Sequence, residues 1–185
     1  MNAHTTNIAA LLKRNQAFAT TEDRRHVMPL SFIPRQRSFV ITCLDPRVDP
    51  AAFLGLRLGD AIVVRSLGGR VTAATLRDVA YFSYLVETKA PEGPYFEVTV
   101  IHHTDCGSSL LADETFRHRF AERAGYDEQE LAELPVVDPA ETVRTDVERL
   151  LSAPQLSPRI TVSGHVYDVE TGLVTTIVGP SPVGG

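Results

Sequence analysis

The chain has 185 residues, the length of one compact domain that can bury a core of its own. Its composition is 43% hydrophobic and 22% charged, which excludes the disordered, collagen-like and coiled-coil classes. The formal net charge of −5 argues against a nucleic acid or an anionic membrane surface as the main partner.

The N-terminus and the cysteine content bear on the cellular compartment. Residues 1–10 have neither a basic start nor an apolar stretch of the signal-peptide kind, and no apolar run approaches the ~18 residues that would span a bilayer. The two cysteines, Cys43 and Cys106, do not make a disulfide framework. We therefore expect a cytoplasmic protein with reduced thiols, in which paired cysteines are more often metal ligands or redox groups than bridges.

The first segment of the chain is predicted to be a helical arm. Apolar residues at Ile8, Leu11, Leu12 and Phe18 have the spacing of an amphipathic helix, which needs a surface to pack on. A polar and basic connector follows at 20–37. We expect two units, the arm with its connector at 1–37 and an α/β domain at 38–185.

Apolar, β-branched runs alternate with helical patterns in the first half of the domain. Asp49 followed by Pro50 has the pattern of a helix start, with a capping carboxylate and a proline at the first helical position. The glycine pair at 68–69 predicts a tight turn. The elements expected here are strands at 38–43, 61–65 and 96–102, a short helix at 49–54, and a helix at 72–87 that is apolar nearly all round and therefore expected to be covered on two sides.

The second half continues the alternation and ends in a hairpin. Residues 108–134 have a polar helical pattern with poorly defined ends, in which Ser108 and Ser109 indicate a helix start more than a nucleophile. Asp138 and Pro139 predict the start of a helix that continues to residue 151. Strands are expected at 160–166 and 172–178, joined by a short turn.

This order of elements predicts the fold class. Strands that alternate with helices form right-handed βαβ units, hence a mostly parallel sheet with helices on both faces. The terminal hairpin adds an antiparallel edge strand. In such sheets the functional crevice lies at the carboxyl ends of the strands.

Three potential metal ligands fall at that edge. Cys43 ends the first strand, while His103 and Cys106 follow the third, and two thiolates with one imidazole suit Zn²⁺ better than hard cations. Three protein ligands leave a fourth position open, which is typical of a catalytic site. His102 is the one nearby candidate for a fourth ligand, but strand alternation directs it away from the side of His103. The alternative is two small buried cysteines and a structural histidine.

Asp45 and Arg47 follow Cys43 directly. One interpretation is a solvated turn with a capping acid. The other is an ion pair whose carboxylate accepts a hydrogen bond from a metal-bound water, with the guanidinium keeping the carboxylate ionised and oriented.

The two motifs together resemble those of the β-class carbonic anhydrases, through Cys-x-Asp-x-Arg at 43–47 and His-x-x-Cys at 103–106. The resemblance implies one zinc per chain held by Cys43, His103 and Cys106, with Asp45 and Arg47 as the catalytic dyad. It also implies a four-stranded parallel sheet of order 2-1-3-4 with an extra edge strand. The family's basic unit is a homodimer in which the N-terminal helix embraces the partner, so the resemblance implies a homodimer or a higher homo-oligomer.

The chain departs from many members after the second strand, where it has Arg-Ser-Leu-Gly-Gly at 65–69 in place of an arginine followed by Asn-Ala-Gly. It resembles a compact branch that includes enzymes acting on carbonyl sulfide or carbon disulfide. We expect reversible hydration of carbon dioxide to bicarbonate by zinc-bound hydroxide. Two alternatives stay open: carbonyl sulfide or carbon disulfide hydrolysis at the same site, and a non-catalytic zinc-binding or thiol redox-sensing protein.

Overall fold

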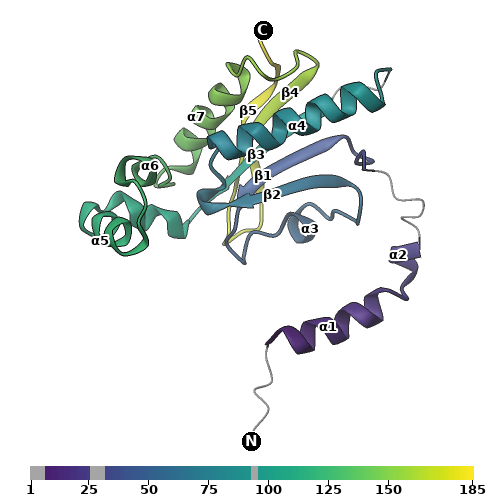
Figure 1. The fold of residues 1–185 in the computed structure, drawn as a ribbon, viewed down its shortest axis with the longest axis horizontal. Coiled ribbons are helices and arrows are strands. Elements are labelled where there is room, and N and C mark those ends of the chain that lie inside the picture. The colour runs from purple at the N-terminus through teal and green to yellow at the C-terminus, as the bar shows by residue number, and fades with distance from the viewer. Residues whose placement is uncertain (1–6, 26–31, 93–95) are drawn as a thin grey trace, which may run out of the picture.

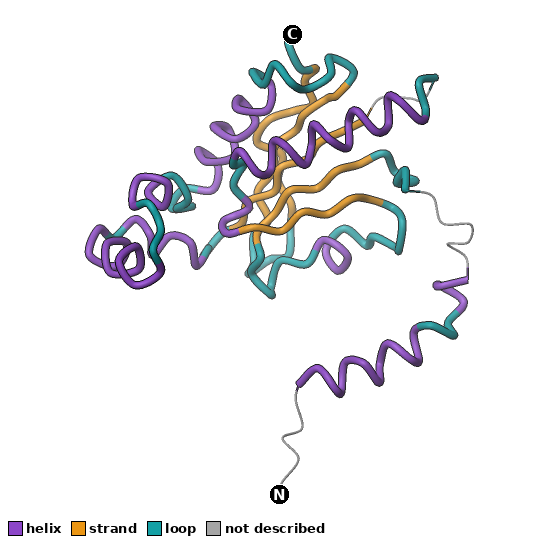
Figure 2. Tube along the Cα trace, in the orientation of Figure 1, coloured by secondary structure: helices purple, strands orange, loops and turns teal. Residues whose placement is uncertain are grey.

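A computed structural model describes residues 7–25, 32–92 and 96–185. Its strands form one five-stranded sheet of order β2-β1-β3-β4-β5, in which β5 alone runs antiparallel to its neighbour (Figures 1 and 2). The predicted fold class, strand order and edge strand are confirmed. The strands are β1 (Ser38–Cys43), β2 (Ala61–Ser66), β3 (Phe96–His103), β4 (Ile160–Tyr167) and β5 (Val174–Pro182).

The helices begin where the sequence predicts caps. The Asp49 carboxylate accepts from the Ala51 N–H, and the Asp138 carboxylate accepts from the N–H groups of Ala140 and Glu141. The α-helices are α1 (Asn7–Phe18), α2 (Glu22–Arg25), α3 (Pro50–Phe53), α4 (Ala73–Lys89), α5 (Glu114–Ala124), α6 (Glu128–Ala132) and α7 (Pro139–Leu151), and the 3₁₀ helices are η1 (Leu67–Gly69) and η2 (Gly107–Ala112).

Two regions differ in detail from their predicted bounds. The helical stretch expected at 108–134 is three separate helices, η2, α5 and α6. Asp113 is extended and caps α5 after η2, and Gly125 adopts a left-handed conformation that ends α5. The last strand begins two residues later than expected and continues to Pro182. Prolines at 180 and 182 are compatible with β5 because it is an edge strand.

The main core lies between one face of the sheet and the helices α4 and α7 (Figure 1). Alternate residues of β1, Phe39 and Ile41, point into this layer with their counterparts on β3 and β4. The short helix α3 packs on the other face, where its Phe53 stacks on Tyr167 with ring centroids 4.4 Å apart. The carboxyl ends of the parallel strands open at one edge, beside α3.

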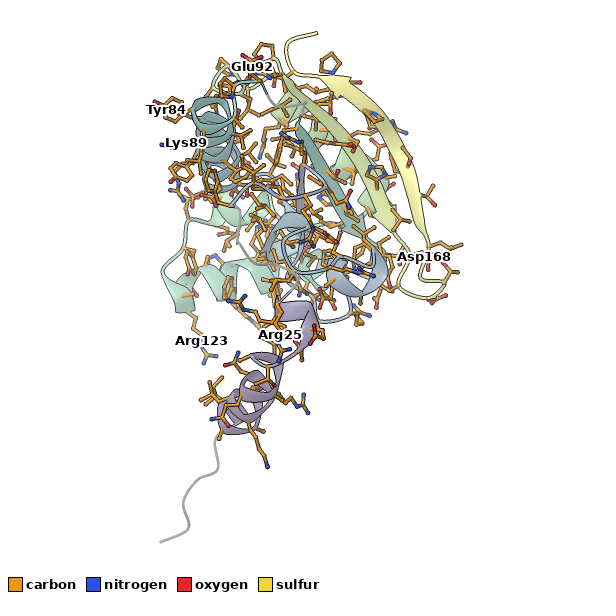
Figure 3. All side chains as sticks on the ribbon, turned by 90° about the vertical axis from the view of Figure 1, so that its right-hand side faces the viewer. Arg25, Tyr84, Lys89, Glu92, Arg123 and Asp168 are labelled. Atoms are coloured by element: carbon orange, nitrogen blue, oxygen red, sulfur yellow. The ribbon has the colours of Figure 1, made fainter. Side chains whose placement is uncertain are left out.

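Two apolar surfaces stay exposed in the single chain. Helix α1 projects away from the sheet (Figure 2), and its Ile8, Leu11 and Leu12 are each more than half exposed. On α4, Tyr81 and Tyr84 are about two-thirds exposed, and Tyr84 points outward (Figure 3). The second cover expected for α4 therefore does not come from the described residues of its own chain. No helix in that described part is long and apolar enough to cross a membrane.

Candidate metal centre

The ends of β1 and β3 bring three ligand atoms together. Cys43 and His103 are the last residues of these neighbouring strands, and Cys106 follows three residues after β3. The two sulfurs and a ring nitrogen all lie within 4.8 Å of one another, and the two sulfurs are 3.9 Å apart. All three side chains are buried. This arrangement could hold one metal ion.

The His103 ring turns one of its two nitrogens toward the two sulfurs. Its Nδ1 lies 2.9 Å from the carbonyl oxygen of Thr104, which can only accept, so Nδ1 carries the proton. The other nitrogen, Nε2, is buried and has no hydrogen-bond partner in the described part of the chain. A buried imidazole nitrogen that faces a thiol and has no other described partner is suited to be a metal ligand.

The two thiols are unequal in acidity because they share a hydrogen bond. The hydrogen bond to Cys106 and burial raise the pKa of Cys43, while the hydrogen bond from Cys43 lowers the pKa of Cys106. Further contacts from His103 and Ser108 act in the same direction on Cys106. Of the two thiol protons, the one on Cys106 is therefore lost first.

Asp45 and Arg47 form an ion pair beside the three potential ligands. Arg47 Nη2 lies 2.7 Å from Asp45 Oδ2, Arg47 Nε lies 3.0 Å from Asp45 Oδ1, and the Arg47 N–H donates to the same Oδ1 over 2.9 Å. The hydrogen bonds from Arg47 hold the pKa of Asp45 at about 2, so this carboxylate is charged at neutral pH. The structure thus brings together all five residues singled out by their motifs.

The sequence interpretation assigned no role to Arg65 or Asp105, which hold this segment in place. Arg65, on β2, donates to the carbonyl oxygens of Cys43 (3.0 Å) and Asp45 (2.6 Å). Asp105 accepts from Arg47 through both its carboxylate (2.7 Å) and its carbonyl oxygen (2.8 Å). The sequence did contain a signal for Arg65, because this is the one charged residue in a strand that is otherwise mostly apolar.

The glycine turn after β2 packs directly on the end of β1. A Cβ at Gly69, which has φ +68°, would lie 2.7 Å from the carbonyl carbon of Thr42 and 2.9 Å from the nitrogen of Cys43. The expected tight turn is therefore part of the site, because only glycine permits this approach.

His102 points to the opposite side of β3, as strand alternation predicts. Its Nδ1 lies 2.8 Å from the hydroxyl of Thr142, and its Nε2 lies 3.3 Å from a carboxylate oxygen of Asp146. Both partners belong to α7. His102 is therefore not a fourth ligand, and a metal ion held by Cys43, His103 and Cys106 would keep one position open.

An open pocket of 590 Å³ lies beside the Arg47 side chain. Its lining residues are Arg47, Thr104, Asp105, Asp168, Val169 and Glu170. The pocket reaches the ion pair from solvent, so small polar molecules can approach Arg47 without a change in the fold.

Comparisons with known proteins agree with this geometry. The model of a family described as carbonic anhydrase matches residues 38–174. β-Carbonic anhydrase 1 of Mycobacterium tuberculosis is 29% identical over 149 residues, covering 80% of this chain and 86% of that protein. A carbon disulfide hydrolase of Acidianus sp. is 28% identical over 159 residues, covering 74% of each. The crystal structure of a carbonic anhydrase from Streptococcus mutans superposes with a TM-score of 0.78 at 32% identity, covering 95% of this chain and 99% of that one.

Proposed function

The chain belongs to the β-carbonic anhydrase family, and on this premise we propose that it catalyses the zinc-dependent, reversible hydration of carbon dioxide to bicarbonate. The observation that carries the proposal is the buried group of Cys43, His103 and Cys106, whose potential ligand atoms all lie within 4.8 Å of one another. The reaction combines CO₂ with water and releases bicarbonate and one proton.

The spacing and chemistry of the three side chains suit zinc. Two Zn–S bonds of about 2.3 Å at a tetrahedral angle require sulfurs about 3.8 Å apart, and the sulfurs of Cys43 and Cys106 are 3.9 Å apart. Thiolate and imidazole ligands favour zinc over magnesium or calcium. Because metal binding needs both thiols reduced, the proposal also places the protein in a reducing compartment such as the cytoplasm.

Asp45 supplies the acceptor that orients the reacting water. When bound, zinc lowers the pKa of a water at its open position, so that hydroxide is available near neutral pH. The two oxygens of the Asp45 carboxylate offer about four acceptor sites, and Arg47 occupies three of them, two on Oδ1 and one on Oδ2. No described residue occupies the remaining site on Oδ2, so it can accept a hydrogen bond from water, and Arg47 keeps the carboxylate ionised and fixed in direction.

Carbonyl sulfide or carbon disulfide hydrolysis is the second candidate activity. It is supported by the similarity to a carbon disulfide hydrolase. The same attack on carbonyl sulfide would give carbon dioxide and hydrogen sulfide, so these three side chains do not distinguish the substrates. The test is to assay one zinc-loaded preparation for CO₂ hydration and for sulfide release from both sulfur compounds. We expect turnover of CO₂ to be the fastest, and faster sulfide release would reassign the substrate.

A non-catalytic metal-binding or redox-sensing protein is the third reading, and the Asp45–Arg47 pair argues against it. Metal storage or thiol sensing needs the two sulfurs but has no need for an ionised carboxylate fixed beside them. The same assays separate this reading from the first two. A protein that binds zinc and turns over none of the three compounds would be a binding protein.

We further propose that two chains form a homodimer through the exposed apolar surfaces. Helix α1 carries an apolar stripe with no cover among the described residues, and a groove of 410 Å³ lies between β2, an edge strand, and α4. The mass in solution, measured by light scattering, tests this. We expect a dimer for the full chain and a smaller species for Leu11→Glu, and an unchanged dimer in that variant would exclude α1 from the interface.

A further inference from the structure

Ser108 is a buried hydroxyl in contact with one of the sulfurs. It lies in η2, two residues after Cys106, and is 3% exposed. Its Oγ is 3.2 Å from Cys106 Sγ and accepts a hydrogen bond from the N–H of Val136 over 3.1 Å. Val136 belongs to the segment between α6 and α7, so the hydroxyl joins that segment to the metal centre.

The direction of the contact with sulfur follows from the number of available protons. A metal-bound thiolate carries no proton and can only accept. The Val136 N–H can only donate, and it occupies one acceptor site of the hydroxyl. The single hydroxyl proton of Ser108 is therefore left for Cys106 Sγ.

Apart from the contact between the two sulfurs, the other described hydrogen bond to them comes from the backbone. The N–H of Asp45 donates to Cys43 Sγ over 3.4 Å. In the described part of the chain, and leaving the three ligands themselves aside, Ser108 Oγ is the only side-chain atom within hydrogen-bonding distance of either sulfur. It is thus the one such donor that a substitution can remove.

We propose that Ser108 is a positioning residue that donates its hydroxyl proton to the Cys106 thiolate and thereby sets how much charge this sulfur gives to the metal. The inference rests on the proposed function, because it requires a metal ion at Cys43, His103 and Cys106. A hydrogen bond to a ligating thiolate withdraws charge from sulfur and stabilises it against protonation. Two thiolates would otherwise neutralise most of the charge of Zn²⁺, so this donor preserves part of the metal's ability to acidify water.

The variants separate the hydrogen bond from packing. Ser108→Ala removes the donor, and Ser108→Thr restores a hydroxyl at the same position. Ser109→Ala is the matched control, since it makes the same change one residue further along η2, at a side chain with no described contact to sulfur. Each variant is loaded with Co²⁺, whose sulfur-to-metal charge-transfer band reports the electron density on the thiolates directly.

We expect the band of Ser108→Ala to move to longer wavelength, because an unbonded thiolate gives up an electron more easily. The band of Ser108→Thr should return toward that of the unmodified protein, and Ser109→Ala should leave it unchanged. Zinc should bind Ser108→Ala roughly 10-fold more weakly in competition with a chelator. An unchanged band and unchanged zinc affinity in a folded Ser108→Ala would overturn the proposal.

A second measurement needs no variant and therefore stays decisive if Ser108→Ala, which leaves the buried Val136 N–H without a partner, fails to fold. In the unmodified protein loaded with the magnetic isotope of cadmium, a scalar coupling should appear between the metal and the Ser108 hydroxyl proton, transmitted through the Cys106 sulfur. Cadmium bound by both thiolates without that coupling would overturn the inference alone. Failure of the unmodified protein to bind cobalt or cadmium through sulfur would overturn the proposed function instead.

Discussion

Arg70 and Asp146 form an ion pair inside the protein, with Arg70 Nε 2.7 Å from Asp146 Oδ2 and both side chains less than a tenth exposed. The two residues are 76 positions apart, one directly after the glycine turn of η1 and the other in the middle of α7. Asp146 also accepts from the backbone N–H of Val71. The pair therefore fixes the turn that contacts Cys43 to the helix that covers the sheet.

This pair makes stability depend on pH in a defined window. Burial alone would raise the pKa of Asp146, but the contacts with His102 and Arg70 outweigh it and lower the pKa. A lowered carboxyl pKa contributes stability above its ordinary value near 4, and this contribution is lost as the pH falls through the folded-state value. Asp146→Asn should lower the free energy of unfolding by roughly 3–5 kcal/mol near neutral pH, because it leaves the Arg70 charge buried without its partner.

Urea unfolding at a series of pH values checks this prediction. The difference in the free energy of unfolding between the unmodified chain and Asp146→Asn should become smaller as the pH falls below about 4. Glu148→Gln, an equivalent change on the exposed side of α7, is the control and should differ little from the unmodified chain at any pH. A difference that stays constant down to strong acid would contradict the account.

Gly69 should tolerate alanine much less well than Gly172 does. Both glycines have φ near +70°, but a Cβ at Gly69 would meet the backbone of Thr42 and Cys43, whereas at Gly172 it would meet nothing within 4 Å. Gly69→Ala should therefore lower the free energy of unfolding by roughly 1–3 kcal/mol more than Gly172→Ala does. Thermal or urea unfolding of the two variants measures this difference. Equal losses in the two variants would show that the turn does not pack on β1 as described.

Replacing Cys106 by serine should remove most of the bound metal. The unmodified chain should carry about one zinc per chain after purification, because the two thiolates and one imidazole form one tetrahedral site with an open position. A serine hydroxyl is a poor replacement for a soft thiolate. Elemental analysis provides the measurement, with Ser109→Ala as the control, and full zinc occupancy in Cys106→Ser would show the ligand assignment to be wrong.

Asp45→Asn should still bind zinc, and its rate of CO₂ hydration should fall by about 10–100-fold. The amide is neutral and offers acceptor sites on one oxygen only, so it cannot hold Arg47 and accept from water as the carboxylate does. The matched control is Asp49→Asn, four residues further on, where asparagine caps α3 as well as aspartate does. Normal turnover in Asp45→Asn would reduce the ion pair to a feature of the turn.

The parts of the fold that depend on local pattern could be predicted from the sequence. The run at 38–43 is apolar and β-branched and forms β1 with the same bounds, and Asp138 with Pro139 begins α7 as expected. The bounds of β5 could not be predicted, because an exposed edge strand lacks the apolar pattern that burial imposes. The pairing of Arg70 with Asp146 depends on tertiary contacts between distant segments, which no local pattern encodes.

The site was predictable only as far as its motifs extend. Cys43, Asp45, Arg47, His103 and Cys106 occupy motif positions at strand ends, and the parallel topology then places them at one edge. Ser108 follows the second motif and has the local pattern of a helix start. Its partner Cys106 is only two residues away in the chain, but its hydrogen bond from the N–H of Val136 depends on a later segment that returns to the site, which no local pattern encodes.

The most direct test is a metal titration followed by the rate of CO₂ hydration. Protein stripped of metal with a chelator receives zinc in increments, and the initial rate is measured at each point. We expect a negligible hydration rate without metal. The rate should rise linearly with added zinc and stop rising at about one zinc per chain, and it should not rise in Cys106→Ser. A rate that does not increase with zinc, or an equal increase in Cys106→Ser, would contradict this expectation.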